Sequence, residues 1–312
     1  MNAQSALLTI GTRGSPLALA QANMTAAALV AAHGWSEGAV VLDIIRTTGD
    51  ATQDRPLSEI GGKGLFTKEI DTAQLEGRVN LAVHSAKDLP TVLPDGLVIA
   101  GYLPRADIRD ALIAPRWKSL SNLPNGARIG TVSLRRQSML KRLRSDLVVE
   151  NVRGNVETRL NKAADGTFDG VILAMAGLTR LGLDGHVTEI LDAEHFIPAV
   201  GQGAIALVTR ADDEKTIALV AAIAHRKTGL ELAAERAFLG VLDGSCRTPI
   251  GGSARIDGGQ LRFSGIVLSP DGTEARECHE SIPASNEADA AALGARLGRS
   301  LRAEQPAGLS AL

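Results

Sequence analysis

A cysteine within a glycine-rich segment is the first residue of this sequence whose setting indicates chemistry. Cys246 lies in LDGSCRTPIGG, between a Gly-Ser pair and a Thr-Pro pair that should end any regular structure. Structural cysteines have apolar neighbours, whereas the neighbours here are small, polar or charged. The segment therefore predicts an accessible thiol on a loop. The other cysteine, Cys278, lies in the charged stretch EARECHE and is interpreted as incidental.

Cationic and hydroxyl side chains recur at the points where apolar, strand-like runs end. They lie in the segments GTRGS, GGKGLF, HSAKDLP, GTVSLRRQ and VRGNVETR. The residues are Arg13, Ser15, Lys63, His84, Ser85, Lys87, Ser133, Arg135, Arg136, Arg153 and Arg159. One of these segments, HSAKDLP, also contains the carboxylate of Asp88. In open α/β sheets, ligands bind beyond the carboxyl ends of the strands, where helix N-termini attract anions. Because the arginine fork matches carboxylates and phosphates, the pattern favours a small ligand with several negative groups.

Some of these residues have alternative interpretations. Arg135 and Arg136 fall in a first helical turn, where a cation opposes the helix dipole, so their position calls for a reason. For His84 we favour a structural role in which its hydrogen bonds are satisfied. For Asp88, a turn residue and a functional acid are equally consistent with the sequence.

Composition and spacing exclude several function classes. A net charge of −2, with 45% hydrophobic and 22% charged residues, indicates a soluble globular protein and argues against a nucleic-acid or membrane-surface binder. The cysteines make no disulfide framework or zinc site, and no histidine pair has metal-ligand spacing. Lys63 in GGKG does not fit a P-loop, and GQGAIA breaks the dinucleotide fingerprint. With no leader segment in view, we expect a cytoplasmic protein without metal, nucleic-acid or membrane partners.

Strand-like and helix-like segments alternate over the first two-thirds of the chain. This alternation predicts an α/β fold of parallel βαβ units with helices on both faces. In SPLALAQANMTAAALVAAHG, Ser15 is expected to cap a helix, Pro16 to occupy its first turn and Gly34 to end it. Thr67 is expected to cap the helix that precedes VNLAVHS.

The pattern changes after about residue 225. A helical stretch, TGLELAAERAFLGVLDG, precedes a run that alternates like an antiparallel meander, with turns at 257–259 and 270–272, and a closing helix over 286–301. This region predicts a small α+β domain with Cys246 in the loop between its helix and its sheet. Upstream, the similar segments TIGTRGSPLALAQ and RIGTVSLRRQSML favour two related α/β domains that meet near 103–109.

Taken in order along the chain, these segments resemble the porphobilinogen deaminase family. The resemblance is carried by TRGSPLALAQA, GGKGLF, AVHSAKDLP, GTVSLRRQ, RGNVETRL, LAMAGLTRLG, PAVGQGA and ERAFLGVLDGSCRTPIG. It implies an enzyme that joins four porphobilinogen units head-to-tail, with loss of ammonia at each addition, and releases a linear tetrapyrrole, hydroxymethylbilane. It also implies a dipyrromethane cofactor attached to Cys246 through a thioether.

The resemblance also implies roles for individual residues. Asp88 matches the catalytic acid, which would stabilise the cation that develops as ammonia leaves. The cofactor would be held by Cys246, Lys87, Ser133, Arg135, Arg136, Lys63 and Thr131. The substrate and the growing chain would contact Arg13, Ser15, Arg153, Arg159 and Arg180. Val132 stands where the family usually has a second serine, so one hydroxyl contact is expected to be missing, and Ala86 replaces a larger apolar residue.

The implied architecture has three domains, and we expect a monomer. Two α/β domains resembling periplasmic binding proteins would comprise residues 1–104 with 202–222, and residues 105–201, with a cleft between them. An α+β domain at 223–312 would carry the Cys246 loop. The chain would return to the first domain through the buried-looking segment AIALV.

Two other function classes remain open on the residues alone. A protein that binds an anionic ligand without chemistry would share the fold and the arginines, but would have no need for Cys246 and Asp88. A cysteine-nucleophile hydrolase or amidotransferase would need a histidine beside the thiol, for which His84 and His195 are the candidates.

Overall fold

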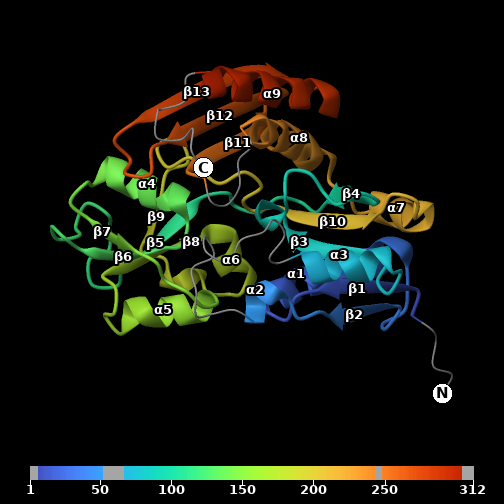
Figure 1. The fold of residues 1–312 in the computed structure, drawn as a ribbon. Coiled ribbons are helices and arrows are strands. Elements are labelled where there is room, and N and C mark those ends of the chain that lie inside the picture. The colour runs from blue at the N-terminus through green and yellow to red at the C-terminus, as the bar shows by residue number, and fades with distance from the viewer. Residues whose placement is uncertain (1–5, 52–66, 243–247, 304–312) are drawn as a thin grey trace. The chain divides into compact units, whose positions relative to one another are not determined.

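The computed structural model describes residues 6–51, 67–242 and 248–303 of the chain. The chain divides into two compact units, each built from two segments (Figure 1). The first unit comprises Met1–Arg105 and Ala204–Gly229, and the second comprises Ala106–Gly203 and Leu230–Leu312. Each unit is described separately below.

The first unit is built on a five-stranded sheet with the strand order β2-β1-β3-β10-β4. Its strands are β1 (Leu8–Thr12), β2 (Val40–Ile44), β3 (Leu81–Ser85), β4 (Leu97–Tyr102) and β10 (Ile205–Arg210). Its helices are α1 (Pro16–His33), α2 (Thr48–Ala51), α3 (Lys68–Leu75), the short 3₁₀ helix η1 (Ala86–Asp88) and α7 (Glu214–Ala221).

Helices cover both faces of this sheet. On one face, Leu81 and Val83 of β3 pack with Ala22 and Leu29 of α1 in a core that also takes in α7. On the other face, α3 contacts β1, β3 and β10, and its Ile70 is fully buried. The alternation of strand side chains between the two faces produces this division.

The predicted caps of α1 are confirmed. Ser15 is the N-cap and its side chain accepts a hydrogen bond from the N–H of Ala18, Pro16 begins the helix, and Gly34 ends it in the left-handed conformation. The expected cap of α3 is only half right. Thr67 occupies the N-cap position of α3, but its side chain makes no capping hydrogen bond.

The second unit contains a five-stranded sheet in the order β7-β6-β8-β5-β9. Its strands are β5 (Asp110–Ile113), β6 (Arg128–Gly130), β7 (Val148–Glu150), β8 (Gly170–Ala174) and β9 (Glu189–Ile190). The connecting helices are α4 (Leu134–Leu143), α5 (Val156–Ala164), α6 (Met175–Arg180) and the 3₁₀ helix η2 (Asp184–His186).

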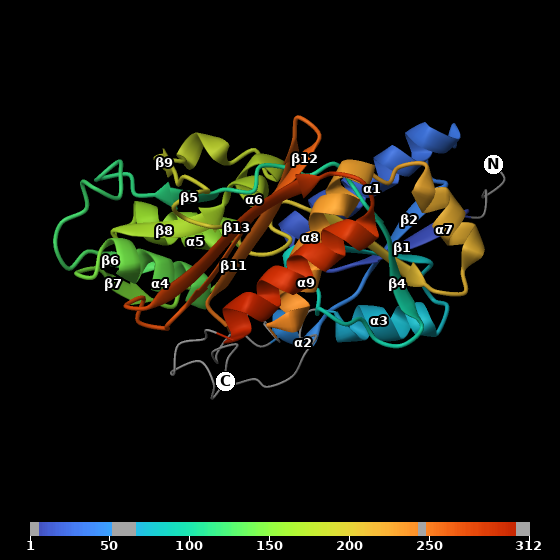
Figure 2. The ribbon, with the colours of Figure 1, turned by 90° about the horizontal axis from the view of Figure 1, so that it is seen from above.

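The predicted C-terminal meander is confirmed as an antiparallel sheet of the second unit. It consists of β11 (Ile250–Asp257), β12 (Gln260–Leu268) and β13 (Ala275–Pro283), and it packs with α8 (Arg226–Val241) and α9 (Glu287–Ala303). Figure 2 shows α8 and α9 beside this sheet. Ile266 and Leu268 of β12 also join the core that contains Leu112 of β5 and Met139 of α4.

The predicted α/β class and its parallel βαβ units are confirmed, and each five-stranded sheet also contains antiparallel strands. In the first unit, β1 is parallel to β2 and β3, whereas β10 is antiparallel to both β3 and β4. In the second unit, β6 is parallel to β7 and β8, whereas β5 is antiparallel to β8 and β9. The antiparallel strands arise where the chain enters a sheet without a βαβ crossover. None of the helices in the described part of the chain has the length and apolar character needed to cross a bilayer.

Candidate functional site

A small pocket lies at the carboxyl ends of β1 and β3 in the first unit. It has a cavity volume of about 60 Å³, and its polar lining consists of Arg13, Ser15, Gln21, Thr67, His84, Ser85 and Asp88. Because β1 and β3 are parallel, their carboxyl ends meet at one edge of the sheet. Three residues proposed from sequence, Arg13, Ser15 and Asp88, are therefore brought together.

The segment after β3 carries the acid. η1 turns the chain immediately after Ser85, so that Lys87 is half-buried and Asp88 is exposed at its end. Ala86 is buried, and its N–H donates to the carbonyl of Ala204, which fixes the start of this turn. The pocket thus combines an exposed carboxylate with a guanidinium, so it can contact both a cationic and an anionic group.

Gln21 is a pocket residue that the sequence analysis missed. It is buried in α1, and its Nε2 donates to the Oγ of Ser85 at 2.9 Å, which joins the helix to the end of β3. The available signal was an amide, six residues after the Ser15 cap, in the largely apolar stretch LALAQANM.

His84 differs from its sequence interpretation. It is 5% exposed, and burial, with a further contribution from the charge of Arg13, lowers the pKa of its imidazole to about 4. The ring is therefore neutral near pH 7. Its Nε2 is buried and has no hydrogen-bond partner among the described residues, so the expectation of satisfied hydrogen bonds is not met.

In the second unit, the predicted residues gather where β6 leads into α4. Ser133 is the N-cap of α4, and its Oγ accepts a hydrogen bond from the N–H of Arg136. Thr131 is buried, and its Oγ1 accepts from the N–H of Ser133 at 3.3 Å. This arrangement sets the direction of the first turn of α4, which carries Arg135 and Arg136.

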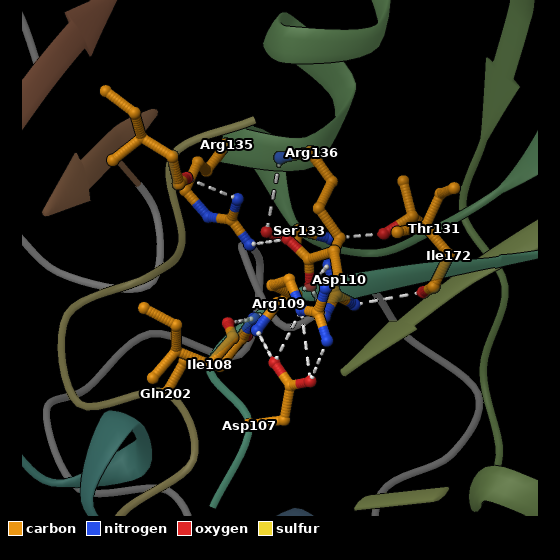
Figure 3. Close-up of polar contacts among 11 residues, drawn as sticks. Asp107, Ile108, Arg109, Asp110, Thr131, Ser133, Arg135, Arg136, Ile172 and Gln202 are labelled. Atoms are coloured by element: carbon orange, nitrogen blue, oxygen red, sulfur yellow. Dashed lines mark hydrogen bonds and ion pairs between the residues drawn. The ribbon is translucent and has the colours of Figure 1, made fainter. Parts of the chain in front are cut away.

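Both arginines of that turn bind one buried carboxylate (Figure 3). Asp110, at the start of β5, is 0% exposed and accepts from Arg135 Nη2 at 2.7 Å and from Arg136 Nη2 at 2.6 Å. Gln202 Nε2 donates to the same carboxylate at 2.9 Å. Arg136 Nε also donates to Asp110 at 3.0 Å, and the Nη1 atoms of Arg135 and Arg136 donate to the backbone carbonyls of Ile197 and Ile172.

This cluster explains why cations occupy a first helical turn. Burial alone would raise the pKa of Asp110, but the charges and hydrogen bonds of Arg135 and Arg136 overcome that effect and hold its pKa well below the usual range. Burial lowers the pKa of Arg135, and Asp110 opposes this shift. Asp110 and Gln202 were missed from sequence, because the carboxylate lies 25 residues before Arg135 in the chain.

The other predicted cations of the second unit come from elements other than α4. Arg153 is half-buried in the loop before α5, and Arg159 in α5 donates from Nε to the carbonyl of Gly154 at 3.0 Å. Arg180, at the end of α6, donates from Nη2 to the carbonyl of Gly203 at 2.7 Å. Burial lowers the pKa of Arg180 to about 10, and its Nε has no hydrogen-bond partner among the described residues.

Two proposed residues, Cys246 and Lys63, lie outside the described residues. His195, a candidate thiol partner, has a side chain that is 78% exposed. Within residues 6–51, 67–242 and 248–303, no three acidic, histidine or cysteine side chains form a group that could hold a metal ion.

The solved structures to which the chain is similar have low sequence identity and TM-scores below 0.5. A YaeC-family lipoprotein from Enterococcus faecalis is 14% identical with a TM-score of 0.39, over 71% of this chain and 93% of that protein. A Salmonella typhimurium periplasmic binding protein with high arginine specificity is 10% identical with a TM-score of 0.37, over 70% of this chain and 92% of that protein.

Sequence relatives are far closer and span nearly the whole chain. A porphobilinogen deaminase of Nitrobacter hamburgensis is 55% identical over 296 residues, which are 95% of this chain and 93% of the relative. The porphobilinogen deaminase of Paracoccus denitrificans is 50% identical over 96% of this chain and 95% of its own length.

Two family models match successive parts of the chain. The model described as porphobilinogen deaminase, dipyromethane cofactor binding domain, matches residues 8–218. The model described as porphobilinogen deaminase, C-terminal domain, matches residues 230–303. With both models and the relatives in agreement along the chain, this protein belongs to the porphobilinogen deaminase family.

Proposed function

We propose that this chain is a hydroxymethylbilane synthase, a transferase that joins four porphobilinogen units head-to-tail with release of ammonia. The product is the linear tetrapyrrole of porphyrin and heme biosynthesis. Family membership over nearly the full chain supports this activity. The structural observation that supports it is the pocket that Asp88 and Arg13 both line.

The pocket suits the chemistry of each addition. As ammonia leaves porphobilinogen, positive charge develops on the pyrrole unit, and a carboxylate beside it stabilises that charge and helps to move protons. Asp88 is the proposed catalytic residue. Arg13 and Ser15 are the proposed partners of the acetate and propionate groups, because a guanidinium and a hydroxyl both donate hydrogen bonds to carboxylates.

The described residues also fit a dipyrromethane, which carries four carboxylates. Arg135 retains a buried Nε that has no hydrogen-bond partner among the described residues, so the cluster keeps an unused donor beside the α4 N-terminus. We assign the cofactor contacts to Thr131, Ser133, Arg135, Arg136, Lys87 and Lys63, and the thioether to Cys246. When bound, the cofactor supplies a nucleophilic ring carbon to which the first substrate unit is joined.

Arg153, Arg159 and Arg180 are the proposed contacts of the substrate and the lengthening chain. Each added unit brings two more carboxylates, so cations at several strand and helix ends are needed. Arg180 supports this assignment because it is half-buried, is cationic at neutral pH and has one nitrogen without a partner among the described residues. A guanidinium in that state gains more from a carboxylate than an exposed one does.

The remaining proposals concern the whole chain. We propose a cytoplasmic monomer with three domains, at 1–104 with 202–222, at 105–201 and at 223–312. The return of β10 to the first sheet supports the split first domain.

Intact mass spectrometry of the purified protein tests the proposed function. We expect a permanent mass increment of two deaminated pyrrole units, absent in Cys246→Ser, and further one-unit steps on addition of porphobilinogen. Asp88→Asn should keep the increment and lose most ammonia release, by about 100-fold or more.

Cys278→Ser is the matched control. Cys278 is half-buried, and burial raises the pKa of its thiol to about 11, so this sulfur is a poor nucleophile. The Cys278→Ser protein should therefore carry the full increment. If the wild-type protein gains no mass after incubation with porphobilinogen, the proposed attachment of the cofactor to Cys246 is wrong. A protein that binds an anionic ligand without catalysis is then the better account.

A further inference from the structure

His84 is a buried polar group of the pocket to which the proposed reaction assigns no task. It is the fourth residue of β3, between Val83 and Ser85. Val83 packs in the core with α1, and Ser85 accepts from Gln21 of α1. Because strand side chains alternate, the imidazole of His84 points to the opposite face, on which α3 packs, and it still lines the pocket with Arg13 and Asp88.

A nitrogen without a partner makes this histidine costly to keep. Nε2 is buried without a hydrogen-bond partner among the described residues. Native proteins satisfy most buried polar atoms, and exceptions occur at functional sites. Replacing such a group with an apolar one of similar shape is neutral or stabilising for the fold.

The pocket chemistry indicates what the ring binds. The pocket has a cavity volume of about 60 Å³, which is above the minimum that one water-sized group needs, so a carboxylate group has room beside Arg13. In the proposed reaction, the carboxylate of Asp88 accepts hydrogen bonds from pyrrole N–H groups and stabilises the positive charge that develops on the substrate. A neutral imidazole beside the cationic Arg13 is suited to donate to a carboxylate, because it adds a hydrogen bond without a second buried charge.

We propose that His84 is a substrate-contacting residue, whose Nε2–H donates to a carboxylate side chain of the pyrrole unit held beside Arg13. This inference rests on the proposed function and adds one specificity contact to it. The contact is made in the ground state as well as the transition state, so it governs KM more than kcat.

Steady-state kinetics of the holoenzyme with porphobilinogen, joined to thermal unfolding, test the assignment. His84→Leu should raise KM by about tenfold or more and change kcat by less than about threefold, since a hydrogen bond to a charged group is lost. The same variant should unfold at the wild-type temperature or above it. His84→Gln, whose amide N–H reaches the position of Nε2, should keep KM within about threefold of the wild type.

The outcomes separate three accounts. An unchanged KM in His84→Leu overturns the proposal. A lower kcat, a higher KM and a lower unfolding temperature together, without rescue by His84→Gln, also overturn it, because that pattern describes a structural histidine. If His84→Leu does not fold, His84→Asn, which keeps a polar atom near Nδ1 but none at Nε2, provides the same comparison. A wild-type protein that releases no ammonia from porphobilinogen contradicts the proposed function itself.

Discussion

At the residue scale, one carboxylate holds two guanidiniums in the interior of the second unit. Asp110, Arg135 and Arg136 are 0%, 3% and 6% exposed, so each charge depends on the others for its stability in the fold. Removing one partner of such a group leaves a buried charge without compensation. The resulting loss of stability is far larger than the net contribution of the intact group to the free energy of unfolding. Asp110 is therefore the residue on which the position of the proposed cofactor-binding arginines depends.

Asp110→Asn is expected to lower the free energy of unfolding at pH 7 by about 3–5 kcal/mol. The pKa of Asp110 is depressed in the folded state, so its contribution is fully present above the unfolded pKa of about 4 and is lost as the pH falls through the lower folded value. The difference between wild type and variant should be constant from about pH 8 to about pH 5 and shrink at more acid pH. Urea unfolding at several pH values measures it.

Asp146→Asn is the matched control for this prediction. Asp146 also pairs with an arginine, Arg144, through two hydrogen bonds, but both side chains are partly exposed. Solvent screens such a pair, so its loss should be much the smaller of the two. If both variants lost the same free energy of unfolding, burial would not be the reason for the stability that the Asp110 cluster contributes.

The cations of this site could be predicted from sequence, but their counterion could not. Arg135 and Arg136 are conspicuous because a first helical turn disfavours positive charge. The carboxylate that compensates them comes from a different strand, and spacing along the chain carries no signal for that pairing. The same limit applies to Gln202, which reaches Asp110 from 92 residues away.

At the scale of elements, the turn between β12 and β13 is fitted against α4. Ser138 Oγ of α4 donates to the carbonyl of Pro270 at 3.1 Å. Gly272 has a positive φ of 74°, and a Cβ there would lie 2.3 Å from the carbonyl oxygen of Ser138. The turn residues could be predicted from the sequence, whereas their contact with α4 could not.

Gly272→Ala should destabilise the protein more than Gly258→Ala. Gly258 lies in the β11–β12 turn with a φ of 54°, and apart from its two chain neighbours no described residue has an atom within 4 Å of the position that a Cβ would take there. Gly258→Ala should therefore cost only the left-handed backbone penalty, about 1–2 kcal/mol. Gly272→Ala adds a steric clash with α4 and should cost about 1–3 kcal/mol more. Urea unfolding of the two variants makes the comparison, and equal losses would contradict the close approach to α4.

Element boundaries follow from local chemistry, but strand direction does not. The Ser15 cap and the alternating pattern of the meander are local signals, and both predictions are confirmed. The antiparallel direction of β5 and β10 depends on where the chain comes from, which residue periodicity does not record. The parallel pairs could therefore be predicted from the sequence, whereas the antiparallel strands that make both sheets mixed could not.

At the scale of the whole molecule, the sheet that carries the pocket is completed by a distant segment. β10 lies between β3 and β4 in the first unit, although the second five-stranded sheet is encoded between β4 and β10. Leu207 pairs with Val83 of β3 on one side and with Gly101 of β4 on the other. β3, which ends at the pocket, therefore gains its second neighbouring strand only after the chain has passed through the other unit.

Leu207→Ala tests this dependence. The side chain is 0% exposed in the core of the first unit, so its truncation should lower the free energy of unfolding by about 2–5 kcal/mol. Because β10 bridges its neighbours, amide hydrogen exchange should rise in β3 and β4 together, while β8 of the second unit keeps its protection. Turnover should fall as well, since Asp88 ends the short helix η1 that follows β3.

Leu173→Ala provides the reciprocal control, because Leu173 is a buried residue of β8 in the second unit. It should raise exchange in β8 and β5 and leave β3 and β4 protected. Faster exchange that stays within β10 itself in Leu207→Ala would contradict the bridging role, because β3 and β4 would then hold their structure without it. Exchange that rises equally in both units in either variant would mean that the chain unfolds as one cooperative body, and the separate stability of the pocket-bearing sheet would be disproved.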